Sequence, residues 1–517
     1  MNHNLYAALR EGFPADLDQT AIEAFEPDSS APLDYRWRDL ERGTAMLANL
    51  LQSMALPAES RIAVQTEKSV EALMLYLATL RAGFVYLPLN PAYQQSELDY
   101  FITNAEPAVV VCSGANFGWL SKLAFRAGTR HVFTLNTDRS GSLLERASHM
   151  SDQHTPVQKE PGDLAAIIYT SGTTGRSKGA MLSHGNLLSN ARVLKDYWDW
   201  REGDVLIHAL PIFHVHGLFV AIHGALLNGS KMLWFSKFEA LPMLRQLPRA
   251  SVFMGVPTLY VRLLAEPGLT HDACRSMRLF ISGSAPLLMS TFDAFRQRSG
   301  HTILERYGMS ETVMLTSNPC RPEDGERIGG TVGRPLPGVS VRIVDDQGAA
   351  RSTGEIGGVE VRGPNVFSGY WRMPEKTREE FAGEADGERW FKTGDVGRFD
   401  DNGYLTIVGR SKDLIISGGY NVYPAEVEGY LNAIEGIAES AVIGVPHPDF
   451  GEAVLAVLIA KPGAVVDGAA LIAELKSRIA NFKVPKRVVI AAELPRNAMG
   501  KVQKNLLRQA HERAFEG

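Results

Sequence analysis

Short apolar segments alternate with helical segments over the first two thirds of the chain. The apolar runs are rich in branched side chains and are bounded by turn residues: "RIAVQT", "FVYLPLN", "AVVVCS", "LAAIIYT", "VLIHALP", "SVFMGVP" and "MRLFISGSA". Between them lie segments with helical periodicity such as "SVEALMLYLATLRAG", in which Ser69 is a suitable N-cap and Gly83 a suitable C-cap. Buried strands that alternate with helices predict an α/β fold with a doubly wound, mainly parallel sheet. Such folds bind ligands at the loops that leave the carboxyl ends of strands.

The pattern changes near Gly338, where alternating, glycine-punctuated runs such as "VSVRIVD" and "GYLTIVGR" begin. These runs predict a small antiparallel β unit. The residues after 409–424 read as helix, two strands, helix, strand and a last helix, which is typical of a compact α+β module. We therefore expect a large N-terminal domain over residues 1–410 and a smaller α+β domain over residues 411–517.

Composition narrows the class of partner. A chain of 517 residues is too long for one core, so at least two domains are expected. Its 45% hydrophobic content is too high for a disordered protein. A formal net charge of −5 argues against nucleic acid as the main partner. Three scattered cysteines favour neither a disulfide framework nor structural zinc. No apolar run approaches the roughly 20 residues that cross a bilayer. We expect a cytoplasmic protein, without a membrane span, that binds small molecules, and its oligomeric state is open between monomer and homodimer.

The stretch "YTSGTTGRSKGA", residues 169–180, directly follows the apolar run "DLAAIIYT". Glycines leave backbone N–H groups free to turn toward an anion, hydroxyls add donors, and Lys178 adds a positive charge. A flexible linker would seldom carry threonines and a lysine directly behind a buried strand. A Walker P-loop requires Gly-Lys-Ser/Thr, whereas Lys178 is followed by Gly179. The stretch therefore predicts a phosphate-binding loop outside the Walker register.

Five motifs in order resemble those of the adenylate-forming superfamily, which includes acyl-CoA synthetases, peptide-synthetase adenylation domains and luciferases. They are "YTSGTTGRSKGAMLSHGN", "ERYGMSET", "TGD", "GRSKDLIISGGYNVYP" and "PRNAMGKVQK". Within the superfamily, "LIHALPIFHVHGLFVA" and "GPNVFSGYWRMPEKT" are similar to malonyl-CoA synthetases. The resemblance implies the use of ATP, Mg²⁺ and coenzyme A. It also implies an acid–CoA ligase that forms an acyl-adenylate and then a thioester, releasing AMP and pyrophosphate.

The resemblance further implies a nucleotide site built from these motifs. The implied nucleotide-binding residues are Thr170, Ser171, Gly172, Thr173, Thr174, Lys178, Gly283, Ser284, Ala285, Glu305, Arg306, Tyr307, Gly308, Met309, Ser310, Asp395 and Arg410. Thr170 and Glu311 are implied in catalysis and in binding Mg²⁺. Tyr307 is expected along the adenine and Asp395 on the ribose hydroxyls. Without the motif, Glu311 would be read as a surface acid and Tyr307 as an ordinary half-buried tyrosine.

The smaller domain is implied to serve two steps. Lys501 is the catalytic lysine that acts on the carboxylate and the α-phosphate during adenylation. Lys412 is the hinge about which the mobile domain turns for thioester formation. Gly418 and Gly419 then let the pantetheine arm pass close to the backbone.

The acid is the open part of the prediction. His214 in "LPIFHVHGLF" is the implied catalytic gate residue, with a buried, satisfied histidine as the alternative. Malonate has a second carboxylate that needs a cation, for which Arg262 in "VPTLYVRLL" is our candidate and Lys237 a weaker one; Arg262 could equally be a surface helix residue.

Ile222, Val313 and Met314 are assigned to the acyl pocket. Ile222, Val313 and Leu315 replace more polar residues of several malonyl-CoA synthetases and would make this pocket more apolar. The leading hypothesis is conversion of malonate to malonyl-CoA. Methylmalonate or a short or medium monocarboxylate, and a free-standing enzyme that loads a carrier protein, are the alternatives. A non-catalytic binding protein is a third class, but it would be expected to lack Lys501, Glu311 or the phosphate loop.

Overall fold

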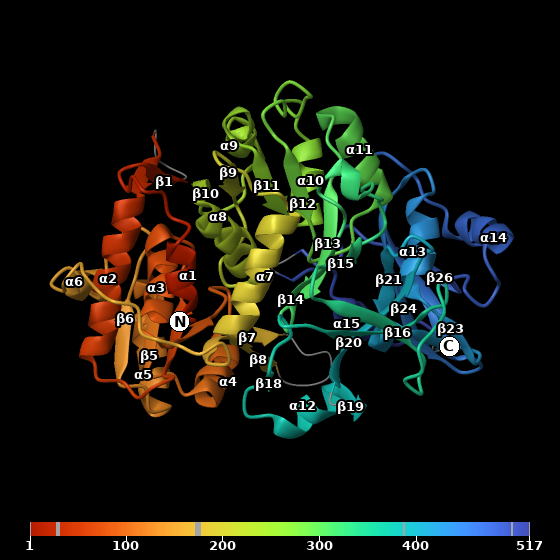
Figure 1. Ribbon diagram of the computed structural model, residues 1–517. Coiled ribbons are helices and arrows are strands. Elements are labelled where there is room, and N and C mark those ends of the chain that lie inside the picture. The colour runs from red at the N-terminus through yellow and green to blue at the C-terminus, as the bar shows by residue number, and fades with distance from the viewer. Residues whose placement is uncertain (1, 27–30, 171–176, 386–387, 498–499, 516–517) are drawn as a thin grey trace.

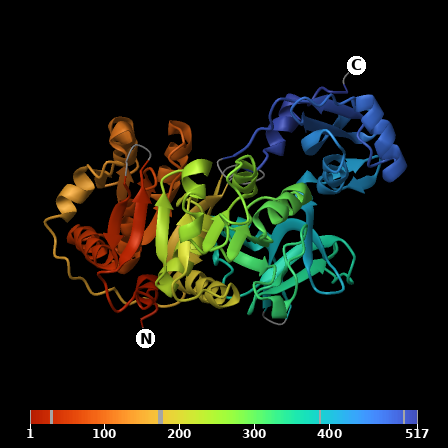
Figure 2. The same ribbon diagram turned by 90° about the horizontal axis from the view of Figure 1, so that it is seen from above.

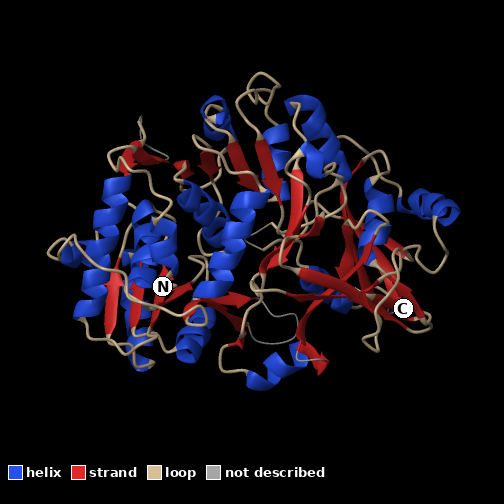
Figure 3. Ribbon diagram, viewed as in Figure 1, coloured by secondary structure: helices blue, strands red, loops and turns tan. Residues whose placement is uncertain are grey.

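The computed structural model of the protein describes residues 2–26, 31–170, 177–385, 388–497 and 500–515. A large α/β body carries a smaller lobe at its C-terminal side (Figure 1), and the view from above separates the two clearly (Figure 2). Four sheets organise the molecule, and helices pack around the two largest of them (Figure 3).

The seven-stranded sheet has the order β18-β8-β7-β4-β3-β5-β6. Its strands are β3 (Arg61–Gln65), β4 (Val85–Pro88), β5 (Val109–Cys112), β6 (His131–Thr134), β7 (Leu164–Thr170), β8 (Lys178–Ser183) and β18 (Gly369–Tyr370). The strands from β6 to β7 in this order run parallel, whereas β8 and β18 are antiparallel. The intervening helices are α3 (Val70–Arg81), α4 (Gln95–Ala105), α5 (Gly114–Arg126) and α6 (Ser142–Ala147).

The nine-stranded sheet has the order β15-β14-β13-β12-β11-β9-β10-β1-β2, and its six central strands are parallel. Its strands are β1 (Thr20–Phe25), β2 (Leu33–Arg36), β9 (Val205–His208), β10 (Lys231–Phe235), β11 (Val252–Gly255), β12 (Leu279–Ser282), β13 (Leu304–Met309), β14 (Val313–Ser317) and β15 (Arg334–Pro335). The other helices of the large body are α1 (Leu5–Arg10), α2 (Trp37–Ser53), α7 (His184–Tyr197), a π-helix (His216–Ala221), α8 (Ile222–Asn228), α9 (Ala240–Leu244), α10 (Pro257–Leu264), α11 (Met289–Ser299) and α12 (Pro374–Glu380).

Two smaller sheets complete the fold. The antiparallel β unit consists of β16 (Ser340–Val344), β17 (Gly357–Arg362), β19 (Phe381–Ala385), β20 (Glu388–Phe399) and β21 (Leu405–Arg410). The C-terminal lobe contains β22 (Ile415–Ser417), β23 (Tyr420–Val422), α13 (Pro424–Asn432), β24 (Ile437–His447), β25 (Gly451–Ala460), α14 (Gly468–Arg478), β26 (Arg487–Ile490) and α15 (Lys504–Ala510). The predicted α/β fold, with its small β unit and smaller C-terminal domain, is confirmed.

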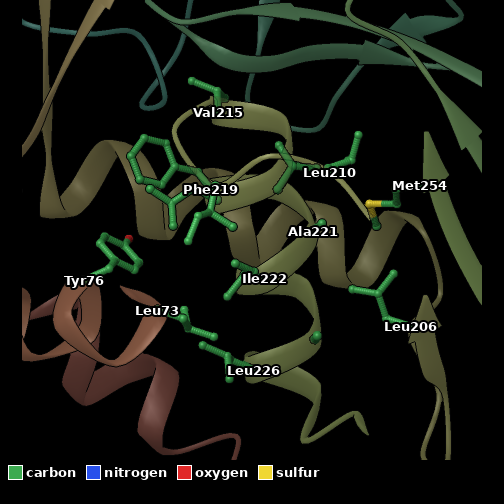
Figure 4. Packing of buried hydrophobic residues seen from close by; sticks show 14 of the residues in the cluster. Leu73, Tyr76, Leu206, Leu210, Val215, Phe219, Ala221, Ile222, Leu226 and Met254 are labelled. Carbon is green, nitrogen blue, oxygen red and sulfur yellow. The ribbon is translucent and has the colours of Figure 1, made fainter. Parts of the chain in front are cut away.

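Helix α3 shows why the two large sheets form one body. Ser69 caps the helix by accepting a hydrogen bond from the backbone N–H of Ala72, and Gly83 follows its end with a φ of 78°. Every residue of α3 is buried, as expected of a helix whose middle is apolar on all sides, and the charged Glu71 and Arg81 lie at its two ends. In the close view its Leu73 and Tyr76 lie toward the π-helix and α8 (Figure 4). One continuous core therefore extends through both sheets.

The C-terminal lobe has its own cores. Separate clusters of buried side chains cover the two faces of its sheet, one under α13 and α14 and the other under α15. None of the described helices is long and apolar enough to cross a membrane.

Candidate functional site

Three residues of the predicted nucleotide site meet at the edge of the antiparallel β unit. Asp395 on β20 lies opposite Arg410 on β21, and the Arg410 Nε is 2.8 Å from the Asp395 Oδ1. The Tyr307 hydroxyl donates to Oδ2 of the same carboxylate over 2.5 Å. The Asp395 carboxylate raises the pKa of Arg410, so the guanidinium stays charged. The structure thus joins three residues that lie far apart in the sequence.

The segment Gly283, Ser284 and Ala285 leaves the carboxyl end of β12, where a parallel sheet presents its ligands. Ser284 has a φ of 73°, an unusual backbone conformation for a serine, and its hydroxyl lies 3.3 Å from the Nδ1 of His216. Close by, the backbone N–H of Leu287 donates to the buried carboxyl of Glu305, whose pKa is raised to about 8 by burial.

The phosphate side is described from its two flanking strands. Thr170 pairs with Lys178 across the β7–β8 hairpin, so the glycine-rich loop joins two antiparallel strands, unlike a P-loop, which opens a helix. Residues Ser171, Gly172, Thr173 and Thr174 lie outside the described residues. The Lys178 Nζ is 3.1 Å from Glu380 and lies over the ring of Tyr370.

Glu311 is buried beside this lysine. The Tyr370 hydroxyl donates to Oε1 of Glu311 over 3.0 Å, and burial raises the pKa of the Glu311 carboxyl. No described residue forms an ion pair with Glu311 within 4 Å. A buried carboxylate without an ion-pair partner is a suitable ligand for a cation.

Lys501 lies near the Asp395–Arg410 ion pair. Its neighbour Gly500 is so close to α10 that a Cβ at Gly500 would lie 3.0 Å from the Thr258 side chain. Lys501 is exposed to solvent, yet desolvation by the protein atoms around it, with the positive charge of Arg410 adding to it, lowers its pKa to about 8. The structure thus brings Lys501 near Asp395 and Arg410, since the charges of both affect its pKa.

The predicted hinge is held by the last helix. Lys412 lies in a single 3₁₀ turn, Ser411–Asp413, and Arg508 of α15 binds the Asp413 carboxylate over 2.6 Å. Gly418 and Gly419 form the tight turn between β22 and β23, both with positive φ. The exposed side chain of Tyr420 follows that turn.

Arg306 is the unexpected feature of the acyl side. It is 2% exposed, and neither its Nε nor its Nη2 has a hydrogen-bond partner among the described residues. Its guanidinium lies directly on Gly283, where a Cβ would come within 2.6 Å of Cζ. Burial lowers its pKa to about 9. The resemblance assigns Arg306 to the nucleotide, and the structure shows a buried cation with two nitrogens that lack partners among the described residues.

Two histidines share this region. His216 is buried, and its Nε2 has no hydrogen-bond partner in the described part of the chain. The positive charge of Arg306 adds to burial in lowering the pKa of His216, which shows that the two groups are close. His214 is half-buried against Phe213, and burial lowers its pKa to about 4. Both rings are therefore neutral at pH 7.

The other predicted acid-binding residues divide into three groups. Arg262 is exposed on α10, and Lys237 is exposed and paired with Glu239, so neither meets the requirement for a buried cation. Ile222 is fully buried and lies toward Leu73 and Leu226, inside the core (Figure 4). Val313 and Met314 are buried on β14, beside Gly308, and Val313 has a φ of 55°, a strained value for a β-branched residue.

Comparison with known proteins identifies the family. Residues 18–371 match the model of the AMP-binding enzyme family, and residues 426–501 match that of the AMP-binding enzyme C-terminal domain. The chain is 35% identical to the malonate–CoA ligase of Arabidopsis thaliana, over 88% of this chain and 78% of the relative.

Solved structures agree over the whole length. The ATP-bound MatB from Rhodopseudomonas palustris is 50% identical, with a TM-score of 0.95 and full coverage of both chains. The apo form of that MatB, also at full coverage of both chains, gives a TM-score of 0.84. The domain arrangement is thus more similar to the ATP-bound form. The prediction of an adenylate-forming enzyme is confirmed, and the chain belongs to the AMP-binding enzyme family.

Proposed function

We propose that the protein is an AMP-forming ligase that joins malonate to CoA, with ATP converted to AMP and pyrophosphate. The observation that carries the choice of acid is the buried, unpaired guanidinium of Arg306. Malonate has one carboxylate to activate and a second one to be recognised. Arg306 presents a planar fork of N–H donors, which suits a carboxylate better than any uncharged acyl tail.

The neighbouring residue does not satisfy this cation. Glu305 precedes Arg306 on the same strand, and successive side chains of a strand point to opposite faces. Glu305 also binds the Leu287 backbone, and burial raises its pKa toward the neutral form. An anion from outside the described protein residues is therefore the natural partner of Arg306.

In the first step the substrate's other carboxylate attacks the α-phosphorus of ATP. Asp395 would accept hydrogen bonds from the ribose hydroxyls, and Lys178 would bind the leaving phosphates. Lys501, in its charged form, would hold the attacking carboxylate against the α-phosphate and reduce the repulsion between the two anions. His214 would act as the gate beside the acyl pocket.

Mg²⁺ fits the same arrangement. Among the described residues no group of three or more His, Cys, Asp or Glu could hold a metal, so the phosphates would have to supply most ligands. Glu311, with Thr170 near it, would supply the protein side. When bound, the ion would neutralise charge on the phosphates.

In the second step the CoA thiol attacks the acyl-adenylate. We propose that the C-terminal domain, residues 411–517, turns about Lys412 and exchanges Lys501 for the Gly418–Gly419 turn. The sheet of this lobe is separate from β21, and the lobe has its own cores, both of which support a boundary after residue 410. A cytoplasmic location stays a prediction.

Methylmalonate is the second candidate acid, because the buried Val313 and Met314 provide an apolar wall for an added methyl group. A panel of malonate, methylmalonate, acetate, octanoate and benzoate, assayed with ATP and CoA, tests the proposal by mass spectrometry of the thioesters. Malonate or methylmalonate should yield more CoA thioester than any of the three monocarboxylates. A preference for a monocarboxylate would overturn the proposal. If the acyl group were transferred only to a holo-carrier protein and not to CoA, the carrier protein would take the place of CoA as the acceptor.

A further inference from the structure

A buried lysine ties the two large sheets together next to the acyl side. Lys68 lies between β3 and α3 and is 8% exposed. Its Nζ is 2.9 Å from the backbone oxygen of His208 and 2.7 Å from that of Phe235, the last residues of β9 and β10. It also lies 2.8 Å from the Nδ1 of His208. One amine from the seven-stranded sheet therefore joins two strand ends of the nine-stranded sheet.

The hydrogen bonds of this pair require an extra proton. The other ring nitrogen of His208 is 3.0 Å from the backbone oxygen of Gly217. Including the Nζ–Nδ1 contact, the cluster makes four hydrogen bonds, which need four N–H hydrogens. A neutral lysine and a neutral imidazole supply only three. The pair therefore carries one shared proton and a single positive charge.

The surroundings support that charge without a carboxylate. Burial lowers the pKa of both Lys68 and His208. Against this, the Lys68 Nζ lies 4.3 Å from the ring centre of Trp234, and the His208 ring stacks on the same indole. None of the acidic side chains that the structure describes forms an ion pair with Lys68. A cation kept in this way at a cost in stability calls for a function.

The contact between His208 and Gly217 indicates a function for this cation. Gly217 is packed so tightly that a Cβ there would lie 2.1 Å from the Pro211 oxygen. The loop between β9 and the π-helix is therefore closed at its neck by two contacts, Gly217 with Pro211 and Gly217 with His208. That loop carries His214, and His216 stands directly before Gly217. A shift of Gly217 would therefore also move the adjacent His216 ring, which lies near Arg306 and Ser284.

We propose that Lys68 and His208 are positioning residues for acid binding, which hold Gly217 and thereby set the place of His214 and His216 in the acyl pocket. This inference rests on the proposed function only in that the pocket receives an acid. The two residues act through the loop and need not touch the substrate.

The test is Lys68→Met in the full-length enzyme, assayed by acid-dependent ATP–pyrophosphate exchange with the preferred acid of the panel. Met keeps the length of the side chain but removes the charge and the donors. The KM for the acid should rise about tenfold or more, while the KM for ATP should change by less than about twofold. Equal changes in the two constants, or no change, would overturn the proposal.

Arg81→Met is the matched control. Arg81 is also a buried cation, at the end of α3, but its donors go to Tyr6, Thr44, Glu41 and the backbone oxygen of His154, and none of these contacts reaches the loop. The melting temperature of Arg81→Met should fall as that of Lys68→Met does, whereas its KM values for the acid and for ATP should be unchanged. An equal rise in the acid KM in both variants would reduce the role of Lys68 to general stability.

Two substitutions at His208 keep the proposal testable if Lys68→Met does not fold. His208→Gln places an amide N–H where the imidazole Nε2 was and can still donate to Gly217, whereas His208→Asn is too short to reach it. The acid KM should stay within about threefold for Gln and rise about tenfold for Asn. Equal effects of the two would contradict the role of the Gly217 contact. Because the acid is taken from the panel, failure of malonate as a substrate leaves this test intact.

Discussion

Two arginines, Arg410 and Arg306, which we assign to the nucleotide side and the acyl side of the proposed site, differ in their pairing. Arg410 has the Asp395 carboxylate 2.8 Å away, and its charge is balanced before any ligand arrives. Arg306 is more deeply buried, and no described residue hydrogen-bonds its Nε or Nη2. In the proposed site the first arginine would orient the carboxylate that we assign to the ribose, whereas the second would offer its unused donors to the acid.

The difference has an energetic meaning. An isolated buried charge costs several kcal/mol, and the rest of the fold must offset it while the site is empty. A substrate carboxylate that reaches Arg306 removes that cost and adds charged hydrogen bonds. Under the proposed function, selectivity for a dicarboxylate would therefore come from an unfavourable feature of the free enzyme.

The strongest way to break the comparison is Arg306→Met. Without the cation, the second carboxylate of malonate would be buried unpaired, so kcat/KM for malonate should fall roughly 100- to 1000-fold. The KM for ATP should change by less than about threefold. Steady-state kinetics with each substrate varied in turn measure both quantities.

Acetate provides the internal control for this variant. It has no second carboxylate, so whatever activity the enzyme has with acetate should not fall in Arg306→Met. Equal loss with both acids would place Arg306 in the nucleotide site, where the sequence motif had assigned it.

The opposite side is tested by Asp395→Asn, which leaves Arg410 without its carboxylate and the ribose without a charged acceptor. The KM for ATP should rise roughly 10- to 100-fold, with the KM for the acid nearly constant. Isothermal titration with ATP alone gives the same comparison without catalysis. A larger effect on acid binding than on ATP binding would mean that the two sides are not separate.

The pH dependence sharpens the comparison further, because Lys501 serves both substrates. Desolvation by the surrounding protein lowers its pKa to about 8, so the charged form is lost as the pH rises through 8. In ATP–pyrophosphate exchange, kcat/KM should therefore fall above pH 8, reaching about a tenfold loss near pH 9, for any acid that reacts. A profile flat to pH 10 would exclude Lys501 as the group that must be charged.

Chemical labelling gives a second measurement of the same group. Reductive methylation followed by mass spectrometry should modify Lys501 at lower pH than the exposed Lys237, and ATP should protect Lys501 alone. Labelling of both lysines in parallel would contradict the lowered pKa.

The sequence predicted the fold well because strands such as Val109–Cys112 and helices such as Val70–Arg81 declare themselves in local patterns. The contact of Tyr307, Asp395 and Arg410 could also be expected, since the three residues come with ordered motifs, and they do meet; their role in nucleotide binding stays a prediction. The buried cation of the acyl side could not be predicted in this way. Whether Arg306 or Arg262 is the buried cation depends on which face of β13 packs on Gly283, and no local pattern records that.

Lys68 illustrates the same limit. A lysine just before a helix N-cap is ordinarily a solvated residue, and its neighbours in sequence give no other signal. Its partners His208 and Phe235 end two strands of the other large sheet, 140 and 167 residues away, and Gly217, which contacts His208, belongs to the π-helix. Only the docking of the two sheets creates the cluster.

The smallest effect is expected at Arg262, the cation that the sequence favoured for the second carboxylate. It is exposed on α10, so truncation removes a solvated charge and leaves no buried group unpaired. Arg262→Ala should leave the KM values for malonate and for ATP within about twofold of the parent enzyme, and the melting temperature nearly unchanged. Measured beside Arg306→Met, this variant shows whether burial decides which of two arginines recognises the acid. A malonate-specific loss in Arg262→Ala that equals the loss in Arg306→Met would mean that the exposed helix closes over the substrate, and that recognition is completed only in the bound state.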